Sequence, residues 1–207
     1  MTAAMLLTAC SSEPDDGMQF SGGDTDGMYG AVLDRPYTVP TTPLTDTGGA
    51  PYSLAGDTDK RLTLVFFGFV NCPDICHIVM SSLTSGLTRL DEDVSDQVEV
   101  VFVTTDPTRD TEQVLRDYLD RYDESYVGLT GDLDTIIEIA KPLAVAVEKG
   151  EKLPSGGYDV AHSTHVVGIG SDDKAPILWT EETSAAQFAD DLAVLLAGDG
   201  PALNLKP

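Results

Sequence analysis

Two strongly apolar runs constrain the fold of this 207-residue chain more than any other feature. Residues 61–69 and 98–105 consist mostly of Val, Leu, Phe and Thr, which are residue types that favour β-strands. A strand that is apolar on both faces has to be covered on both faces, as in the centre of an α/β sheet. The two runs therefore predict two central strands with helices packed on either side.

Helical spacing of apolar residues follows these runs. The spacing predicts helices over residues 73–90, 110–119 and 131–142. A last helix is predicted from Ser184 onward, because its apolar residues again fall on one face. Strands and helices therefore alternate along the chain, which is the arrangement of an α/β domain.

Shorter strand signals complete the pattern. Gly48 and Gly49 separate two strand-like segments and predict an N-terminal hairpin. Strands are also predicted at residues 165–169 and 175–179, around a polar turn, whereas residues 149–157 have the Gly, Pro and Lys content of a loop. Together these signals predict one α/β domain with a central mixed β-sheet flanked by helices.

The ends of the chain differ in composition from the domain, which we expect at residues 35–198. Residues 1–9 are small and apolar, and with Cys10 they resemble the lipobox of bacterial lipoproteins, although no Lys or Arg precedes them. We therefore expect a signal segment whose recorded start lies downstream of the true one, acylation of Cys10 and a lipid anchor on the outer side of the bacterial cell membrane. Residues 10–34 are acidic and rich in Gly and Ser, which predicts a disordered tether, and residues 199–207 are expected to form a tail.

The charge of the chain limits its partners. It has 12 basic against 35 acidic residues, which gives a formal net charge of -23. Such a surface repels nucleic acid and anionic lipid headgroups, and it attracts cations and basic protein surfaces. We therefore expect no nucleic-acid partner, and we expect the membrane to be reached through the lipid anchor.

Cys72 and Cys76 stand where the first apolar run gives way to a helix. Pro73 is favoured at the first helical position, so both cysteines are predicted on one face of the first turn, where the helix dipole favours thiolates. This spacing suits a dithiol/disulfide switch and equally suits two thiolate ligands for a soft metal. A purely structural disulfide would stabilise little, because it would close a very short loop.

Three histidines are available as a third ligand. His162 lies in a segment expected to be a loop leading into a strand, and loops commonly display ligands. His165 is three residues further on and should face the opposite way, whereas His77 adjoins Cys76 but points elsewhere on the helix. Two thiolates and one imidazole suit copper, whereas zinc prefers a fourth ligand, so a zinc site with bound water stays an alternative.

Four segments in the chain resemble the Sco/SenC family of copper chaperones, which act in cytochrome c oxidase assembly. They contain Cys-Pro-x-x-Cys, Asp-Pro-x-Arg-Asp-Thr, Gly-Leu-Thr-Gly and His-Ser, at residues 66–76, 103–111, 126–131 and 158–163. The resemblance spans roughly residues 35–197 and implies a thioredoxin-like fold.

The resemblance also implies the chemistry of the site. It makes Cys72, Cys76 and His162 the ligands of copper, as Cu(I), Cu(II) or both, and it makes the two cysteines a redox-active disulfide pair when oxidised. It further implies the copper-bearing subunit of cytochrome c oxidase as the client, with other copper chaperones or thiol reductants as further partners.

The chain departs from the family pattern at three positions near the ligands. Ala161 stands where the family usually has an acid, His77 where it has Pro and Asn71 where it has His. These departures leave the ligand set intact. In the second segment, Asp106 is expected near the cysteine loop, because strand ends gather at one edge of the sheet. Asp110 or Thr111 is expected to cap the next helix, and a cap is the simpler role for Asp110.

Three functions stay open at this point. The first is a lipid-anchored copper metallochaperone that uses Cys72, Cys76 and His162. The second is an enzyme, a thiol–disulfide oxidoreductase, which needs only the cysteines and would use Cys72 as the nucleophile. The third is a non-catalytic redox sensor or interaction module whose acidic surface docks a basic partner.

Overall fold

A computed structural model describes residues 27–58, 60–152, 158–170 and 172–198 of the chain. The expected signal segment, Cys10, most of the expected tether and the expected tail lie outside these residues. The strands are β1 (Ala31–Thr38), β2 (Leu44–Asp46), β3 (Pro51–Tyr52), β4 (Leu62–Gly68), β5 (Val98–Thr104), β6 (Val127–Thr130), β7 (Val147–Lys152), β8 (Tyr158–His162), β9 (Val166–Ile169) and β10 (Lys174–Trp179). The helices are α1 (Ile75–Leu87), α2 (Glu92–Ser95), α3 (Glu112–Leu119), α4 (Leu133–Ala140), the 3-10 helix η1 (Lys141–Leu143) and α5 (Ala185–Ala197).

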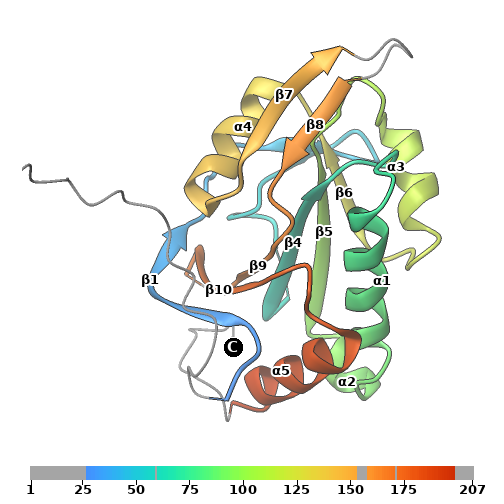
Figure 1. Ribbon diagram of the computed structural model, residues 1–207. Helices are drawn as coiled ribbons and strands as arrows, with labels where there is room; N and C mark the ends of the chain where they lie inside the picture. The colour runs from blue at the N-terminus through green and yellow to red at the C-terminus, as the bar shows by residue number, and fades with distance from the viewer. Residues whose placement is uncertain (1–26, 59, 153–157, 171, 199–207) are drawn as a thin grey trace, which may run out of the picture.

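One mixed sheet organises the fold (Figure 1). Its strand order is β1-β10-β9-β4-β5-β6-β2-β3, and a separate two-stranded ribbon is formed by β7 and β8. Strands β4, β5 and β6 are parallel, whereas β9 runs antiparallel to β4 and β2 runs antiparallel to β6. The predicted central mixed sheet, with β4 and β5 as neighbours, is confirmed.

The two faces of the sheet bury two hydrophobic cores. Alternate residues of β4 point to opposite faces, so Phe66 packs in one core with Phe102 and Met80, whereas Phe67 packs in the other. Helices α1, α3 and α5 cover the first core and α4 covers the second. All seven residues of β4 are buried, as the apolar run predicted.

Polar side chains set the ends of two helices. The Thr111 side chain accepts a hydrogen bond from the Val114 N–H at the start of α3. At the start of α5, Ser184 and Gln187 form a reciprocal capping box. The predicted hairpin is present as β2 and β3, and Gly49 has a φ of +83° in its turn, where glycine is favoured.

Four features differ from the expectations. The first strand begins at Ala31, so residues 31–34, which were assigned to the tether, include residues paired with β10. Residues 149–152, expected in a loop, pair with β8. Neither β6 nor α2 was predicted, because both are short, and β6 contains a glycine.

Within the described residues, none of the helices combines the length and the apolar character that crossing a membrane requires.

Candidate metal centre

The segment between β4 and α1, residues 69–74, forms the cysteine loop. The helix begins at Ile75, with Asp74 as its N-cap, so the prediction that Pro73 opens the helix is wrong. Cys72 therefore precedes the helix and Cys76 lies in its first turn. The Cys76 N–H points back and donates a hydrogen bond to Cys72 Sγ at 3.4 Å, so the helix N-terminus still faces this sulfur.

Both cysteines are free thiols in a largely dry environment. Cys72 is 5% exposed and Cys76 is 0% exposed. Burial raises the pKa of the Cys76 thiol well above its usual value, and the hydrogen bond that this thiol donates to Cys72 raises it further. Without a metal, Cys76 therefore stays protonated at neutral pH, and a bound cation would have to displace that proton.

His162 is the last residue of β8, at the end of the strand rather than in the loop that the sequence predicted. Its Nδ1 lies 2.9 Å from the Ser163 carbonyl oxygen. A carbonyl can only accept, so Nδ1 holds the hydrogen and the lone pair of Nε2 is free to bind. That Nε2 lies 3.6 Å from Cys76 Sγ. Burial lowers the pKa of His162, which keeps the imidazole neutral and able to bind a metal.

These three side chains form one cluster. One ligand atom from each of Cys72, Cys76 and His162 lies within 4.8 Å of the others, which is close enough for all three to bind a single ion. Among the described residues this is the one such group of three or more His, Cys, Asp and Glu side chains. The structure thus brings together the residues that the sequence pointed to.

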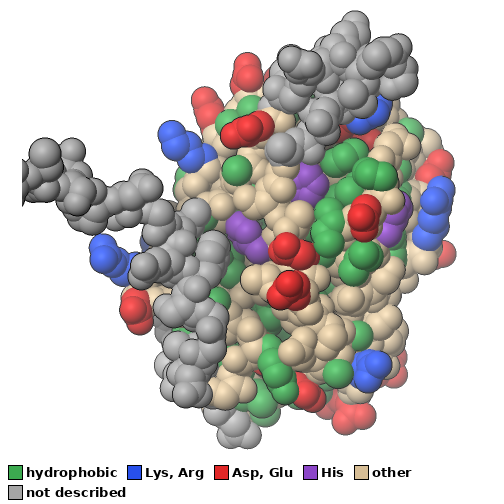
Figure 2. All heavy atoms as spheres, in the orientation of Figure 1, with side chains coloured by type: hydrophobic (Ala, Val, Ile, Leu, Met, Phe, Trp, Pro, Cys, Tyr) green, Lys and Arg blue, Asp and Glu red, His purple; other side chains and the backbone are tan. Residues whose placement is uncertain are grey.

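The other two histidines lie in different surroundings. His165 is 8% exposed, and burial lowers its pKa. His77 is half-buried, and its Nδ1 lies 3.2 Å from the Tyr122 hydroxyl. Neither belongs to the thiol cluster. In Figure 2 purple histidine side chains are visible on the face that also carries a group of green hydrophobic side chains.

Aromatic rings form the walls around His162. The rings of Phe66 and Phe69 meet its imidazole edge to face, with centroids 6.2 Å and 5.8 Å away. Arg109 lies over Phe69, with its guanidinium carbon 6.0 Å from the ring centroid. The imidazole is therefore held both by its hydrogen bond to Ser163 and by packing, which fixes the direction of Nε2.

The loop between β5 and α3, residues 105–111, supports the cysteine loop. Asp106 is 3% exposed and forms an ion pair with Arg109, and Arg109 lies over the ring of Phe69 in the cysteine loop. The predicted place of Asp106 near the cysteine loop is therefore confirmed. Asp110 does not cap α3, because Thr111 does. Asp110 is instead 0% exposed, and its Oδ2 accepts hydrogen bonds from the Val70 N–H at 2.9 Å and the Thr104 hydroxyl at 2.7 Å.

Sequence reasoning did not find this support. A signal was present, since Asp106 and Asp110 lie in the short loop after a buried strand and strand ends converge at one sheet edge. Asp110 also immediately precedes a helix, however, and a carboxylate at that place is usually a cap. The Thr at the next position takes the capping role and leaves the carboxylate to the loop.

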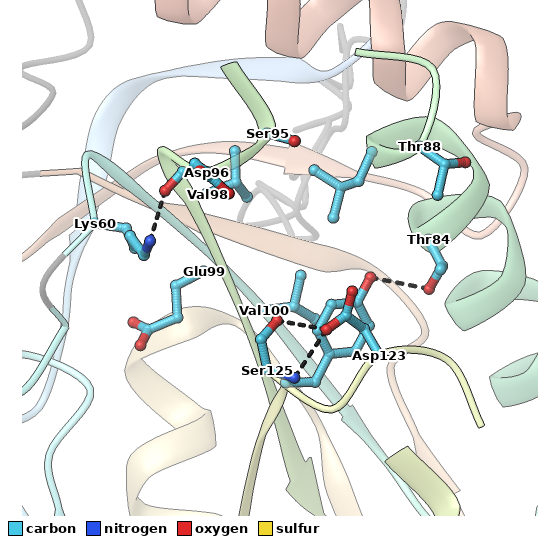
Figure 3. Close-up of a pocket in the computed structure, with 12 residues that line it drawn as sticks. Lys60, Thr84, Thr88, Ser95, Asp96, Val98, Glu99, Val100, Asp123 and Ser125 are labelled. Carbon is cyan, nitrogen blue, oxygen red and sulfur yellow. Dashed lines mark hydrogen bonds between the residues drawn. The ribbon is translucent and has the colours of Figure 1, made fainter. Parts of the chain in front are cut away.

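A polar cavity lies elsewhere, between α1, β5 and the segment before β6 (Figure 3). Its polar groups bond one another: Lys60 Nζ donates to the Asp96 carbonyl at 2.6 Å, and the Thr84 and Tyr126 hydroxyls are 3.0 Å apart. No cysteine or histidine lines this cavity, so it is separate from the thiol–imidazole cluster.

The fold and the cluster together define a thioredoxin-like domain with a dithiol and an imidazole at one edge of its sheet. The model of the SCO1/SenC family matches residues 35–197 of the chain, so the chain belongs to that family. A candidate copper-binding protein of Stutzerimonas stutzeri is 33% identical over 142 residues, which is 68% of each chain. The match spans about half the length of several mitochondrial relatives.

Solved structures agree with this assignment. Apo Sco1 of Thermus thermophilus has a TM-score of 0.72 and 28% identity, over 84% of this chain and 99% of that one. Yeast Sco1 with copper bound has a TM-score of 0.68 and 26% identity, over 83% and 92%. The family resemblance and the thioredoxin-like fold predicted from the sequence are therefore confirmed.

Proposed function

We propose that this protein is a copper metallochaperone in which Cys72, Cys76 and His162 bind the ion that is delivered to the copper-bearing subunit of cytochrome c oxidase during its assembly. The observation that carries this proposal is the cluster itself, with its three ligand atoms within 4.8 Å of one another. The same fold holds copper in yeast Sco1.

The chemistry of the donors fits copper. Two thiolates are soft ligands that favour Cu(I), and a neutral imidazole also suits Cu(II). The tautomer of His162 directs the Nε2 lone pair toward the thiols, and its lowered pKa keeps that lone pair free at neutral pH. Copper is here the cargo of the protein, so the ligands have to release it as well as bind it. A site of only three side chains leaves room for a ligand from the receiving protein.

The proposed location is the outer side of a bacterial cell membrane. The lipobox-like run that ends at Cys10 supports a lipid anchor, and the acidic stretch after it supports a tether that lets the domain reach a membrane-bound client. The boundaries proposed for these segments are residues 1–9 for the signal segment and 10–30 for the tether, because β1 begins at Ala31. Metabolic labelling with a radioactive fatty acid, in wild type and Cys10→Ala, tests the anchor.

Copper binding by the purified chain tests the proposed function. The wild type should bind one copper ion per molecule, Cys72→Ser and His162→Ala should weaken binding sharply, and His77→Ala should not. His77 is the matched control, because it adjoins Cys76 but lies outside the cluster. Unchanged binding in His162→Ala would remove this residue from the proposed site.

A second candidate is a thiol–disulfide oxidoreductase that reduces cysteines of a partner without metal. The observation in its favour is that Cys72 is the more exposed of two free thiols and that its sulfur accepts the Cys76 N–H at the start of α1. This function needs both cysteines but not His162. Oxidase assembly in cells that carry His162→Ala separates the two: retained assembly favours the reductase, and lost assembly favours the metallochaperone.

A further inference from the structure

We propose that Asp110 is a positioning residue that fixes the cysteine loop through Val70 and places an uncompensated negative charge beside the copper site, so that bound copper is biased toward Cu(II). This inference rests on the proposed function, because it concerns the charge of the ion that the site holds. Asp110 contacts neither copper ligand directly; it acts through the loop and through space.

The hydrogen bonds of Asp110 give it control of the loop. Its Oδ2 receives the N–H of Val70 at 2.9 Å, and Val70 lies two residues before Cys72. The Thr104 hydroxyl donates to the same oxygen at 2.7 Å, and that hydroxyl in turn accepts the Asp106 N–H at 2.9 Å. The carboxylate is therefore fixed to the end of β5 on one side and to the cysteine loop on the other.

Burial raises the pKa of Asp110 above its usual value, whereas the hydrogen bonds donated by Val70 and Thr104 act in the opposite direction and favour the ionised form of the carboxylate. Both donors point to Oδ2, whereas the buried Oδ1 has no hydrogen-bond partner among the described residues. A proton on Oδ1 would therefore lack an acceptor, and a proton on Oδ2 would compete with two donors. A fully buried carboxylate with one unused oxygen costs stability, which suggests that the charge serves a purpose at this place.

The nearby charges do not cancel that of Asp110. Asp106 and Arg109 form an ion pair, so these two groups largely neutralise each other. The negative charge of Asp110 lies against the Val70 N–H. Val70 is two residues before Cys72, so their Cα atoms are at most about 7 Å apart. The carboxylate is consequently within roughly 15 Å of the Cys72 sulfur, across a buried region in which charges are weakly screened.

The direction of the effect follows from counting charges. Two thiolates with a neutral imidazole give the ligand set a charge of minus two, so the site is neutral with Cu(II) and has one negative charge with Cu(I). Reduction of bound Cu(II) adds one electron to the site, and the Asp110 charge opposes that addition. Asp110 therefore lowers the affinity for Cu(I) relative to Cu(II).

Asp110→Asn tests this bias, because the amide oxygen can keep both hydrogen bonds while the charge is lost. Affinities of the full chain for Cu(I) and Cu(II) are measured by competition with chelators of known affinity. The variant should raise the ratio of Cu(I) to Cu(II) affinity about tenfold, which corresponds to 59 mV in a one-electron couple. Asp191→Asn is the matched control, since Asp191 is also buried but accepts its hydrogen bonds from Tyr29, Gly30 and Trp179, away from the cysteine loop.

The positioning role has a readout that needs no copper. Hydrogen exchange of the Val70 amide should stay slow in Asp110→Asn and become faster in Asp110→Ser, which has a shorter side chain. If Asp110→Asn does not fold, Asp110→Ser replaces it in the copper measurement with the same expected change in ratio.

A ratio within about twofold of wild type, with copper still bound, would overturn the inference and leave the proposed function intact. An equal shift in Asp191→Asn would also overturn it. Failure of the wild type to bind either ion would instead overturn the proposed function, and this inference with it.

Discussion

Two buried aspartates serve opposite ends of this domain in different ways. Asp191, on α5, is 1% exposed and uses both oxygens: Oδ1 accepts the Tyr29 N–H, and Oδ2 accepts the Gly30 N–H and the Trp179 Nε1–H. Asp110 is 0% exposed but uses only Oδ2. The first carboxylate is saturated with donors, and the second is not.

The difference separates a structural carboxylate from one beside a functional site. Asp191 fastens the chain just before β1 to α5 and β10, and its donors offset the cost of burying its charge. Asp110 holds the loop that contains Cys72, at the edge of the sheet where the thiols and His162 meet. Incomplete satisfaction of a buried charge is more readily tolerated where the charge contributes to a site.

Removal of the saturated carboxylate should have the largest effect on stability. Asp191→Ala leaves three donors without an acceptor, two of them buried, so the free energy of unfolding should fall by about 3 kcal/mol. Urea denaturation measures the loss, and Asp190→Ala, at an exposed neighbouring position, is the control. A loss of less than about 1 kcal/mol would mean that Asp191 is not the structural member of the pair.

In contrast to Asp191→Ala, Asp110→Ala should weaken copper binding more than it lowers the stability of the fold. Only two donors lose their acceptor, and a buried charge is removed at the same time, so the free energy of unfolding should fall by about 2 kcal/mol or less. Copper affinity should fall about 10-fold to 100-fold, because the cysteine loop loses its anchor. Calorimetric unfolding measures the stability, and competition with chelators measures the copper affinity. Equal copper affinity in Asp110→Ala and Asp191→Ala would contradict the assignment of different roles to the two aspartates.

A pair of glycines sharpens the same contrast. A Cβ at Gly68 would lie 2.9 Å from the Phe66 ring and 3.1 Å from Cys76 Sγ, whereas a Cβ at Gly168 would meet Ile177 at 2.6 Å and Trp179 at 2.9 Å. Each substitution by Ala should therefore destabilise the fold by about 1–3 kcal/mol. Copper affinity should fall in Gly68→Ala and stay unchanged in Gly168→Ala. An equal fall in folded Gly168→Ala would show that copper affinity depends on packing throughout the sheet and not only beside Cys76.

Acid should destabilise the fold through His162, which is half-buried, and His165, which is buried, and this is the smallest effect of the series. Burial lowers the pKa values of both His162 and His165 from 6.5, so the unfolded chain takes up their protons first as the pH falls. Their contribution to stability is present above pH 6.5 and is lost as the pH falls through the folded pKa values. Substitution of either residue by Asn should flatten part of this dependence in urea unfolding at a series of pH values.

Copper binding distinguishes these histidines further. Protons compete with the metal for the thiols and, at the lowered pKa of His162, also for its Nε2, so the affinity of the wild type should fall more steeply at some pH below 6.5. His165→Asn should keep this acid dependence, because His165 lies outside the thiol cluster. Loss of the dependence in His165→Asn would point to the wrong histidine as ligand.

The centre of the fold could be predicted from the sequence because its signals are strong. The apolar runs at residues 61–69 and 98–105 can be buried only as central strands, and β4 and β5 occupy them. Ser184 begins α5 with a complete capping box, as its position before a helical pattern indicated. Short elements such as β6 could not be predicted, because four residues that include a glycine show no clear hydrophobic periodicity.

The candidate site also has features that could be predicted from the sequence and features that could not. The ligand residues could be predicted from residue type and spacing, because few side chains bind soft metals and the chain contains only 3 His and 3 Cys. The role of Asp110 could not, since it depends on which N–H the fold brings to the carboxylate, and Val70 is 40 residues away in the sequence. The start of α1 was misplaced because Pro73 fits the first helical position but lies in the cysteine loop.

X-ray absorption spectroscopy of the copper-loaded full chain tests the central claim most directly. Two sulfur scatterers and one imidazole should surround the ion in the wild type, His162→Ala should lose the imidazole signal, and His77→Ala should keep it. An imidazole signal that persists in His162→Ala, or a wild-type site with fewer than two sulfur scatterers, would contradict the assignment of Cys72, Cys76 and His162 as the copper ligands.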